Sequence, residues 1–372
     1  MPRLISAGEV LLGKGSLAAL KALDAARLAV LVSPSLYNDV GQRKLLEGSV
    51  KAESIEIVPM PGGEPTMSRL RPVVAALTAF RPDWIVAVGG GSVIDGAKLS
   101  WVFYEQPEAD LERLSRPFAL TGMRGRARFA AVPTTAGTGS EVSSSAILLD
   151  ETSGAKHPVV SHELLPDLAV LDPSFAVGVP AHAVAAAGFD ALAHALESYV
   201  SKFANPFADA QAEKAVAILL EHLATSWREP DNLTARMEIM QAALMAGWVQ
   251  NLKVPGIGHA VAHQLGGHGL SHGLAAGLLL VPAMQFNAED ATVQSRYQTL
   301  AKRVGLSGDE ALYEALVGLK HELGLTVSDE VAAAIRKDSA GIYAGAQEDV
   351  CAKANPLPFT EEDVSWMLNE AL

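Results

Sequence analysis

The sequence has 372 residues, with 29 Lys and Arg against 42 Asp and Glu, which gives a formal net charge of -13. This charge excludes a non-specific binder of nucleic acid or of anionic membranes, because both surfaces attract positive patches. Hydrophobic residues make up 49% and charged residues 19%, which excludes a disordered chain, and the length predicts about two domains. Cys351, the single cysteine, rules out a disulfide framework and a cysteine-rich metal site and predicts a reducing, cytoplasmic location.

No segment is predicted to enter a membrane. The first residues, MPRLISAGEVLLGKGS, lack an apolar core of signal-peptide length, and the longest apolar run, residues 278–284, is interrupted by Pro282. We expect small solutes as partners.

Short β-branched runs alternate with helical patterns in the first half, which predicts a parallel sheet with crossover helices. The expected strands are residues 28–32, 54–58, 83–88 and 129–132, and the expected helices are residues 34–46 and 66–80. A β-hairpin and a closing strand are expected over residues 146–171, followed by a Pro-bounded hinge at 172–180.

The pattern beyond the hinge is helical almost throughout. Periodicity of 3.6 residues or helix-forming composition predicts helices at residues 205–223, 233–249, 289–304, 308–323 and 329–337. The predicted fold is therefore an α/β domain with a Rossmann-like parallel sheet, residues 1–175, and an all-helical domain, residues 176–372.

Three glycines, Gly89, Gly90 and Gly91, follow the strand at residues 83–88 and precede a helix expected to start near Ser92. Such a turn lets a pyrophosphate approach the backbone and the positive end of the helix dipole. Ser92 and Asp95 also match a capping box. The pattern is neither G-x-G-x-x-G nor a Walker A loop, so a tight α/β turn without a nucleotide is the alternative.

A second polar loop, PTTAGTGSE at residues 133–141, follows the strand at 129–132. Its hydroxyls come from Thr134, Thr135, Thr138 and Ser140. Hydroxyls and amides at two strand ends can hold the phosphates and a ribose in the crevice outside a parallel sheet. The alternative is a polar surface loop.

Histidines concentrate in VPGIGHAVAHQLGGHGLSHG, residues 254–273. His259 and His263 are four residues apart and share one helix face, while the glycines after them predict a turn that returns His272 at the start of the next helix. Asp190 and His194 show the same spacing in an Ala-rich helix. One carboxylate with imidazoles suits Fe, Zn, Co or Mn, whereas structural core histidines are the alternative.

A nucleotide crevice combined with a metal site predicts hydride transfer, in which the metal polarises the substrate oxygen and a nicotinamide exchanges the hydride. His263 is the candidate for a proton relay or for positioning the nicotinamide.

These stretches resemble the iron-containing (group III) alcohol dehydrogenase family. The matching segments are GGGSVIDGAK at 89–98, PTTAGTGSEVSSSAILLD at 133–150, LAVLDP at 168–173, GFDALAHALESYVS at 188–201 followed by NPFADA, and HAVAHQLGGHGLSHG at 259–273. The resemblance implies a dehydroquinate synthase-like two-domain architecture and commonly a homodimer. It implies a metal held by Asp190, His194, His259 and His272, with His263 beside the nicotinamide. The positions implied to contact the dinucleotide are Gly90, Gly91, Ser92, Asp95, Thr134, Thr135, Thr138, Ser143 and Lys156.

Two departures from the family pattern concern specificity. The spacer from His263 to His272 is one residue shorter than in typical members, which changes the expected pocket floor. The strand at 28–32 ends in SPS, where NAD-preferring relatives carry an Asp, so Ser33 or Ser35 offers a hydroxyl to a 2'-phosphate. We therefore expect NAD or NADP, with Fe²⁺ as the first metal and Zn²⁺ as the second.

The expected function is a metal-dependent, NAD(P)-linked oxidoreductase that interconverts a small aldehyde or ketone and its alcohol. The alternatives are a dehydroquinate synthase-like lyase or cyclase that uses NAD transiently, a metal-free enzyme of the maleylacetate reductase type, and a metal hydrolase. The four filled ligand positions argue against the metal-free branch.

Overall fold

The computed structural model describes residues 6–114, 116–151 and 156–372 and divides the chain into two compact units. The sheet unit contains the described residues up to 135 together with 139–177, and the helical unit contains residues 136–138 and 178–372. The expected domain boundary, between residues 175 and 176, lies close to the end of the sheet unit at Val177.

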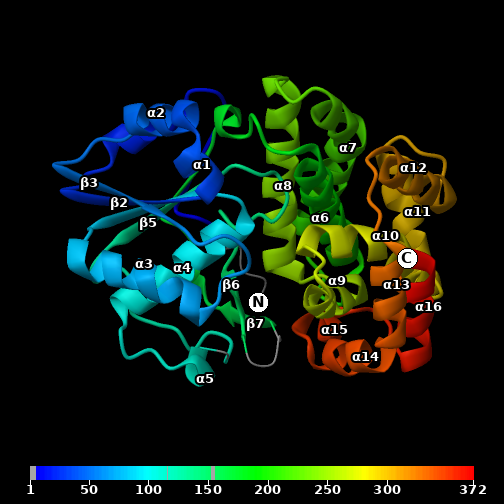
Figure 1. Ribbon diagram of the computed structural model, residues 1–372. Helices are drawn as coiled ribbons and strands as arrows, with labels where there is room; N and C mark the ends of the chain where they lie inside the picture. Colours follow the sequence, from blue (N-terminus) through cyan, green and yellow to red (C-terminus); the bar gives the residue numbers. More distant parts are fainter. Residues whose placement is uncertain (1–5, 115, 152–155) are drawn as a thin grey trace. The chain divides into compact units, whose positions relative to one another are not determined.

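Six parallel strands form the sheet, in the order β1-β8-β5-β4-β2-β3 (Figure 1). The expected parallel sheet is confirmed. Its central strands are continuous apolar runs because helices cover both faces, as the fully buried β4 shows. The strands are β1 (Glu9–Leu12), β2 (Arg27–Val32), β3 (Ser54–Pro59), β4 (Trp84–Gly89), β5 (Arg128–Pro133) and β8 (Leu168–Leu171).

Alternating side chains of β2 enter two separate cores. Ala29 and Leu31 pack in the core beneath α3 (Met67–Phe80) and α4 (Gly91–Glu105). Leu28 and Val30 belong to the core on the other face, which is covered by the 3-10 helix Ser16–Ala22, α1 (Pro34–Asn38) and α2 (Val40–Ser49) (Figure 1). The two-residue period of a strand explains this division.

The single helix expected at residues 34–46 is wrong. The chain forms α1 (Pro34–Asn38) and α2 (Val40–Ser49), separated by Asp39 in an extended conformation. The Asp39 carboxylate accepts a hydrogen bond from the Gln42 backbone N–H at 2.8 Å, so this residue caps the second helix instead of continuing the first.

An antiparallel hairpin extends the sheet unit. It consists of β6 (Ser145–Leu149) and β7 (Lys156–Val160), and the short helix α5 (Leu111–Leu114) precedes it in the chain. The hairpin expected within residues 146–171 is confirmed, and residues 152–155, between its two strands, lie outside the described residues.

The helical unit is built around α6 (Ala181–Val200), which packs against α7, α8 and α10 (Figure 1). Within residues 178–372 the structure contains helices and no strand, which confirms the expected all-helical part. The other helices are α7 (Pro206–Arg228), α8 (Leu233–Lys253), α9 (Ile257–Ala262), α10 (His272–Asn287), α11 (Ala291–Arg303), α12 (Asp309–Glu322), α13 (Asp329–Lys337), α14 (Ser339–Glu348), α15 (Val350–Ala354) and α16 (Glu361–Ala371).

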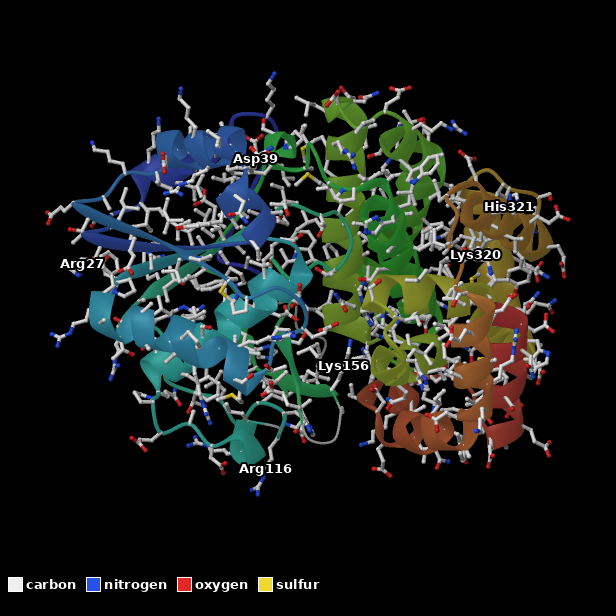
Figure 2. The ribbon with its side chains drawn as sticks, in the orientation of Figure 1. Arg27, Asp39, Arg116, Lys156, Lys320 and His321 are labelled. Atoms are coloured by element: carbon white, nitrogen blue, oxygen red, sulfur yellow. The ribbon has the colours of Figure 1, made fainter. Side chains whose placement is uncertain are left out.

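Charged side chains lie mainly at the surface of each unit. Figure 2 shows exposed Arg27 and Arg116 on the sheet unit and exposed His321 on the helical unit. Among the described residues, no helix combines the length and the apolar character needed to cross a bilayer.

Candidate metal centre and cofactor loops

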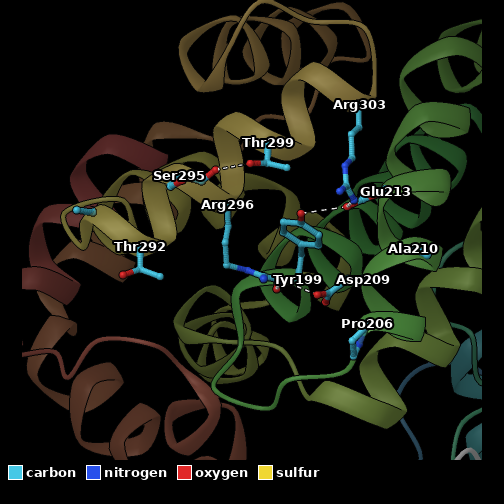
Figure 3. A pocket seen from close by; sticks show the side chains of 11 residues that line it. Tyr199, Pro206, Asp209, Ala210, Glu213, Thr292, Ser295, Arg296, Thr299 and Arg303 are labelled. Atoms are coloured by element: carbon cyan, nitrogen blue, oxygen red, sulfur yellow. Dashed lines mark hydrogen bonds and ion pairs between the residues drawn. The ribbon is translucent and has the colours of Figure 1, made fainter.

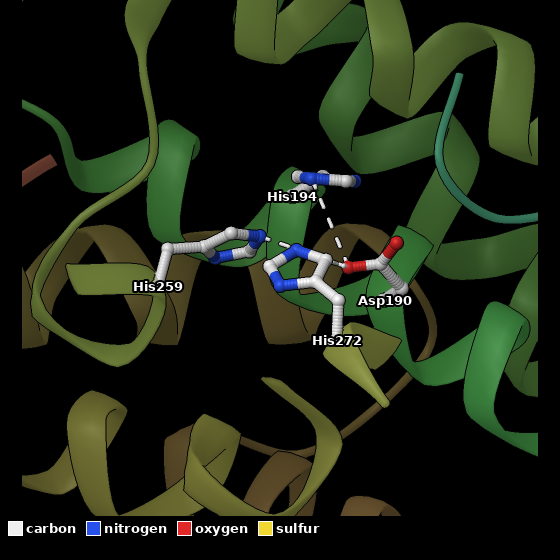
Figure 4. A group of neighbouring side chains, drawn as sticks. All are labelled: Asp190, His194, His259 and His272. Atoms are coloured by element: carbon white, nitrogen blue, oxygen red, sulfur yellow. Dashed lines mark ion pairs between the residues drawn. The ribbon is translucent and has the colours of Figure 1, made fainter. Parts of the chain in front are cut away.

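Four side chains of the helical unit converge on one point (Figure 4). The Nε2 atoms of His194, His259 and His272 lie 3.8, 3.7 and 3.4 Å from Oδ1 of Asp190. The potential ligand atoms of this group all lie within 4.8 Å of one another. The structure thus brings together the four residues that the sequence suggested as metal ligands.

Three helices deliver these groups. Asp190 and His194 stand one turn apart on α6, and His259 lies on α9. α10 begins at His272, as the glycine-rich turn predicted. Gly273 allows α10 to approach α6, because a Cβ at this position would lie 2.5 Å from the carbonyl oxygen of Ala186. The missing side chain at Gly273 therefore brings His272 within reach of Asp190.

The expectation that His259 and His263 share one α-helix needs correction. α9 ends at Ala262, and His263 begins a 3-10 helix that extends to His268. The two rings remain neighbours, with centroids 6.1 Å apart, because the helical turn continues through the change of helix type.

Burial and mutual charge set the protonation of the cluster. Burial alone would raise the pKa of Asp190, but the charges of His194 and His272 outweigh it and hold that pKa well below its usual range. Burial lowers the pKa of His194 to about 4. Burial alone would also lower the pKa of His259, but the Glu197 and Asp190 carboxylates outweigh it and raise that pKa to about 10.

The group fits a first-row divalent metal. A tetrahedral ion with bonds of about 2.1 Å separates its ligand atoms by about 3.4 Å, and the three separations from Asp190 Oδ1 run from 3.4 to 3.8 Å. Oδ1 of Asp190 and Nε2 of His259 are buried and have no hydrogen-bond partner within the described part of the chain. Buried polar atoms of this kind need a partner, and a cation supplies one for both.

His263 lies beside the cluster without joining it. Its ring stacks on that of His272 with centroids 5.1 Å apart, and its Nδ1 lies 2.8 Å from Oδ2 of Asp349. Burial would raise the pKa of Asp349, but His263 outweighs it and lowers that pKa. Since an ionised carboxylate only accepts, Nδ1–H donates and Nε2 stays open for proton exchange.

Sequence reasoning missed Asp349 and Glu197. Glu197 lies on α6, three residues after His194, and its carboxylate is 2.6 Å from Nδ1 of His259. The signal was present in the sequence, because Asp190, His194 and Glu197 all fall on one face of an otherwise apolar helix. Asp349 had no such signal, since it is 86 residues from His263.

In the sheet unit, the glycine loop lies at the carboxyl end of β4, beside the end of β2. The Ser33 backbone N–H donates to the carbonyl of Val88 at 3.0 Å, so the two strand ends are adjacent. From β2 the chain proceeds outward to β3 and then returns to β4 on the opposite side of β2. Such a reversal of strand order is where open α/β sheets bind ligands.

The threonine loop begins at the neighbouring strand end. Thr134 N–H donates to the Gly89 carbonyl at 3.0 Å, and a Cβ on Gly90 would lie 3.1 Å from the Thr135 hydroxyl. The first part of this loop therefore lies against the glycine loop. Thr138 belongs to the helical unit, where its carbonyl accepts a hydrogen bond from Gln250.

The capping box of Ser92 and Asp95 is wrong. α4 begins at Gly91 with Gly90 as its N-cap, and no side chain caps it. Asp95 instead accepts a hydrogen bond from the Ile147 backbone N–H at 3.1 Å, and burial raises its pKa to about 6. The uncapped N-terminus leaves the first amides of α4 available to an anion.

Several other residues implied to contact the dinucleotide also make internal contacts. Ser143 accepts a hydrogen bond from the buried Lys98 Nζ at 3.1 Å, and Lys156 forms an ion pair with Glu64 at 3.0 Å. The Ser33 hydroxyl caps α1 by accepting from Leu36 N–H. The side chains of Ser143, Lys156 and Ser33 therefore also stabilise the loops that carry them.

A groove of about 680 Å³ lies elsewhere on the helical unit, between the end of α6, α7 and α11 (Figure 3). Asp209 pairs with Arg296 at 2.9 Å, and Glu213 pairs with Arg303 (Figure 3). Its charges compensate one another, and none of the four clustered residues lines it. The groove is therefore separate from the four-residue cluster.

Comparison with known proteins gives consistent matches over the whole chain. A family model described as iron-containing alcohol dehydrogenase matches residues 7–173, and the model of the C-terminal part of the Fe-containing alcohol dehydrogenase family matches residues 184–372. An NADPH-dependent butanol dehydrogenase of Clostridium saccharobutylicum is 34% identical over 328 residues, which cover 87% of this chain and 84% of that protein.

Two further relatives extend over nearly complete chains. A 1-propanol dehydrogenase of Salmonella typhimurium is 32% identical over 373 residues, covering 97% of this chain and 97% of that protein. The crystal structure of a 1,3-propanediol oxidoreductase matches with a TM-score of 0.91 at 27% identity and covers 100% of both chains.

Proposed function

This chain belongs to the iron-containing alcohol dehydrogenase family, and on that premise we propose that it interconverts a small aldehyde or ketone and its alcohol with NAD(P) and a divalent metal. In this proposal Asp190, His194, His259 and His272 hold the metal. The carrying observation is the convergence of three imidazole Nε2 atoms on one buried carboxylate oxygen.

When bound, the metal supplies a Lewis acid for the substrate oxygen, and the nicotinamide supplies or accepts the hydride. The residues of the chain hold the metal in place, offset part of its charge and move a proton. Asp190 contributes one negative charge to a mostly buried cluster, which offsets part of the cation's charge, and the three imidazoles add none when neutral. His263 is open at Nε2 and exchanges the proton that accompanies the alcohol.

Asp349 supports that role of His263. By accepting from Nδ1–H, its carboxylate selects the tautomer with a free Nε2 and stabilises the imidazolium when it forms. This arrangement lets one side chain take up and return a proton without leaving its place. In the proposal the His263 ring, which stacks on His272, also positions the nicotinamide.

The sheet unit contributes the dinucleotide site. The uncapped first turn of α4 offers backbone N–H groups to the pyrophosphate, and Gly90, Gly91, Ser92, Thr134 and Thr135 surround it in the proposal. Asp95, Ser143 and Lys156 complete the proposed set in the sheet unit, and Thr138, which belongs to the helical unit, is the remaining residue of the proposal. Because Ser33 and Ser35 stand at the end of β2 with hydroxyls 3.1 Å apart and no carboxylate follows the strand, we infer that NADP(H) is accepted as well as NAD(H).

The test is an assay of the whole chain after chelation and reconstitution with Fe²⁺, Zn²⁺, Co²⁺ or Mn²⁺. A panel of short aldehydes and ketones is tested with NADH and NADPH, and absorbance at 340 nm follows the cofactor. We expect cofactor consumption equal to alcohol formed, and only with metal present.

Three results would overturn the proposal. Product formed while the cofactor returns unchanged indicates the cyclase alternative. Full turnover in protein shown by elemental analysis to be free of metal indicates the maleylacetate reductase type. Failure to bind any dinucleotide in calorimetry leaves a metal hydrolase.

We also propose that the chain acts in the cytoplasm as a homodimer. Its single, buried thiol suits a reducing compartment, and the dimer rests on the family resemblance. Light scattering on the purified protein measures the dimer mass, and fractionation of the source cells tests the compartment.

A further inference from the structure

A buried carboxylate stands directly behind one of the proposed metal ligands. Glu197 on α6 is 1% exposed, and its Oε1 lies 2.6 Å from Nδ1 of His259. Its other oxygen, Oε2, accepts hydrogen bonds from the backbone N–H groups of Gly256 at 3.1 Å and of His259 at 3.2 Å. One side chain therefore contacts both the ring and the backbone of His259.

The same contacts complete the buried N-terminus of α9. The first N–H groups of a helix have no partner within it, and a buried end must find partners elsewhere. Glu197 takes two of these groups, and Oδ1 of Asn355 accepts the Ile257 N–H at 2.9 Å. The side-chain amides of Asn287 and Asn355 donate a hydrogen bond to each other, at 3.0 and 2.8 Å. The short helix is thus fixed to α6 and α10.

The polarity of these bonds determines where the His259 proton lies. Oε2 accepts two backbone N–H groups, and hydrogen bonds of this kind favour the ionised carboxylate, which donates nothing. Nδ1 of His259 must therefore donate to Oε1. Because a metal-binding histidine is neutral, the His259 ring in the metal-bound protein carries its one proton on Nδ1 and presents the Nε2 lone pair on the side of Asp190, whose Oδ1 is 3.7 Å away.

The sequence makes room for this contact. A Cβ on Gly258 would lie 2.8 Å from Oε1 and 2.9 Å from Cδ of Glu197. Any side chain at this position would displace a carboxylate that three hydrogen bonds hold. The glycine before His259 is thus explained by the carboxylate behind the ring.

We propose that Glu197 is a positioning residue that holds His259 as the Nδ1–H tautomer, with Nε2 open to the metal. The proposal rests on the metal centre proposed above and adds a residue that controls metal affinity. Partners behind a metal-binding histidine fix its ring and raise its basicity, and their loss typically weakens metal binding about 10- to 100-fold.

The deciding variant is Glu197→Gln, which keeps the size of the side chain and reverses the polarity of one bond. The amide oxygen must face Gly256 and His259 N–H, since the NH₂ group cannot accept them. The NH₂ group then faces Nδ1 and donates to it, which moves the ring proton to Nε2. We expect the dissociation constant for Co²⁺ and for Zn²⁺, measured by competition with a chromophoric chelator, to rise about 10- to 100-fold.

A second variant separates polarity from packing. Glu197→Asp keeps an acceptor but shortens the side chain, so it creates a cavity and lowers the melting temperature of the metal-free protein more than Glu197→Gln does. We expect the opposite order for metal affinity, with Glu197→Gln the weaker binder. Gly258→Ala keeps the Glu197 carboxylate but pushes it out of position, so this variant should also weaken metal binding.

Glu213→Gln is the matched control. It makes the same chemical change in a carboxylate of the helical unit that bonds the Tyr199 hydroxyl at 3.0 Å and does not belong to the metal group. Its metal affinity should equal that of the original chain.

The outcomes distinguish the two levels of the proposal. If the original chain binds Co²⁺ and Glu197→Gln binds it equally well, Glu197 has no positioning role. If metal affinity merely follows the melting temperatures of the metal-free variants, the role is structural and the proposal is overturned. If the original chain binds no better than His259→Ala, the metal centre itself is wrong, and this proposal is overturned with it.

Discussion

In the helical unit, side chains from three helices converge on one point, whereas in the sheet unit the ends of β2, β4 and β5 offer mainly backbone groups. Asp190 and His259 are buried and lack hydrogen-bond partners at Oδ1 and Nε2 among the described residues. Elsewhere in the sheet unit, Ser143 and Lys156 already bond to Lys98 and Glu64. One site is thus specified by side-chain chemistry and the other by backbone shape.

The difference predicts how each site responds to mutation. A metal is bound by a few strong, localised bonds, so the loss of one ligand should nearly abolish metal binding. A pyrophosphate at a helix N-terminus is held by several amides and a dipole that no side chain replaces. Side-chain changes there should act mainly through crowding.

The largest expected effect is that of removing a proposed ligand. Asp190→Ala or His259→Ala should lose the metal and reduce kcat on the order of a thousandfold or more, since metal polarisation contributes several kcal/mol. Dinucleotide affinity should change little, because the proposed cofactor residues lie on other elements. Elemental analysis, kcat and cofactor titration measure the three quantities, and full activity after loss of the metal would contradict the ligand assignment.

Replacement of His263 should separate proton transfer from metal binding. His263→Ala is expected to lower kcat about a hundredfold, the range of general acid–base catalysis, with metal content unchanged. Parallel loss of metal would make His263 a ligand and remove it from the relay.

Crowding of the glycine loop should affect only the cofactor. In Gly90→Val the new Cβ would lie 3.1 Å from the Thr135 hydroxyl, and its methyl groups would occupy space at the start of α4. We expect the dissociation constant of NAD(P)H to rise about tenfold or more, which corresponds to about 1.4 kcal/mol. Fluorescence titration measures it, with metal content as the control. An unchanged affinity would remove this loop from the site.

The smallest effect is a pH dependence of stability within the sheet unit. Glu141 is 3% exposed, and burial raises its pKa from 4.5 to about 7. Between these values the folded state keeps a proton that the unfolded state releases, so the free energy of unfolding falls as pH rises from 4.5 to 7.

The variant Glu141→Gln removes this contribution. At pH 8 the melting temperature of the metal-free protein should rise by a few degrees, for a gain of at most about 3 kcal/mol. At pH 5 the variant and the original chain should differ little. Equal melting shifts at both pH values would show that ionisation of Glu141 does not limit stability.

Local pattern carried much of the prediction. The parallel sheet was predicted from the apolar runs of β2, β4 and β5, because a strand buried on both faces is apolar throughout. The helical part was predicted from the 3.6-residue periodicity of α7 and α8, because a helix buried on one side has an apolar stripe. The spacing of Asp190 and His194 and the glycines before His272 indicated the metal group, since each pair depends on one turn of helix. The helix break at Asp39 was missed because an aspartate is tolerated inside a helix as well as at its cap.

The sequence by itself determined which residues form the candidate metal group, because their types and short spacings are local properties. Only the tertiary structure decided what lies behind them. The bond from Glu197 to His259 spans 62 residues, and the bond from Asp349 to His263 spans 86. Contacts this distant depend on how the helices pack. Glu197 shares a face of α6 with Asp190 and His194, but no local pattern shows that it contacts His259, and none links Asp349 to His263.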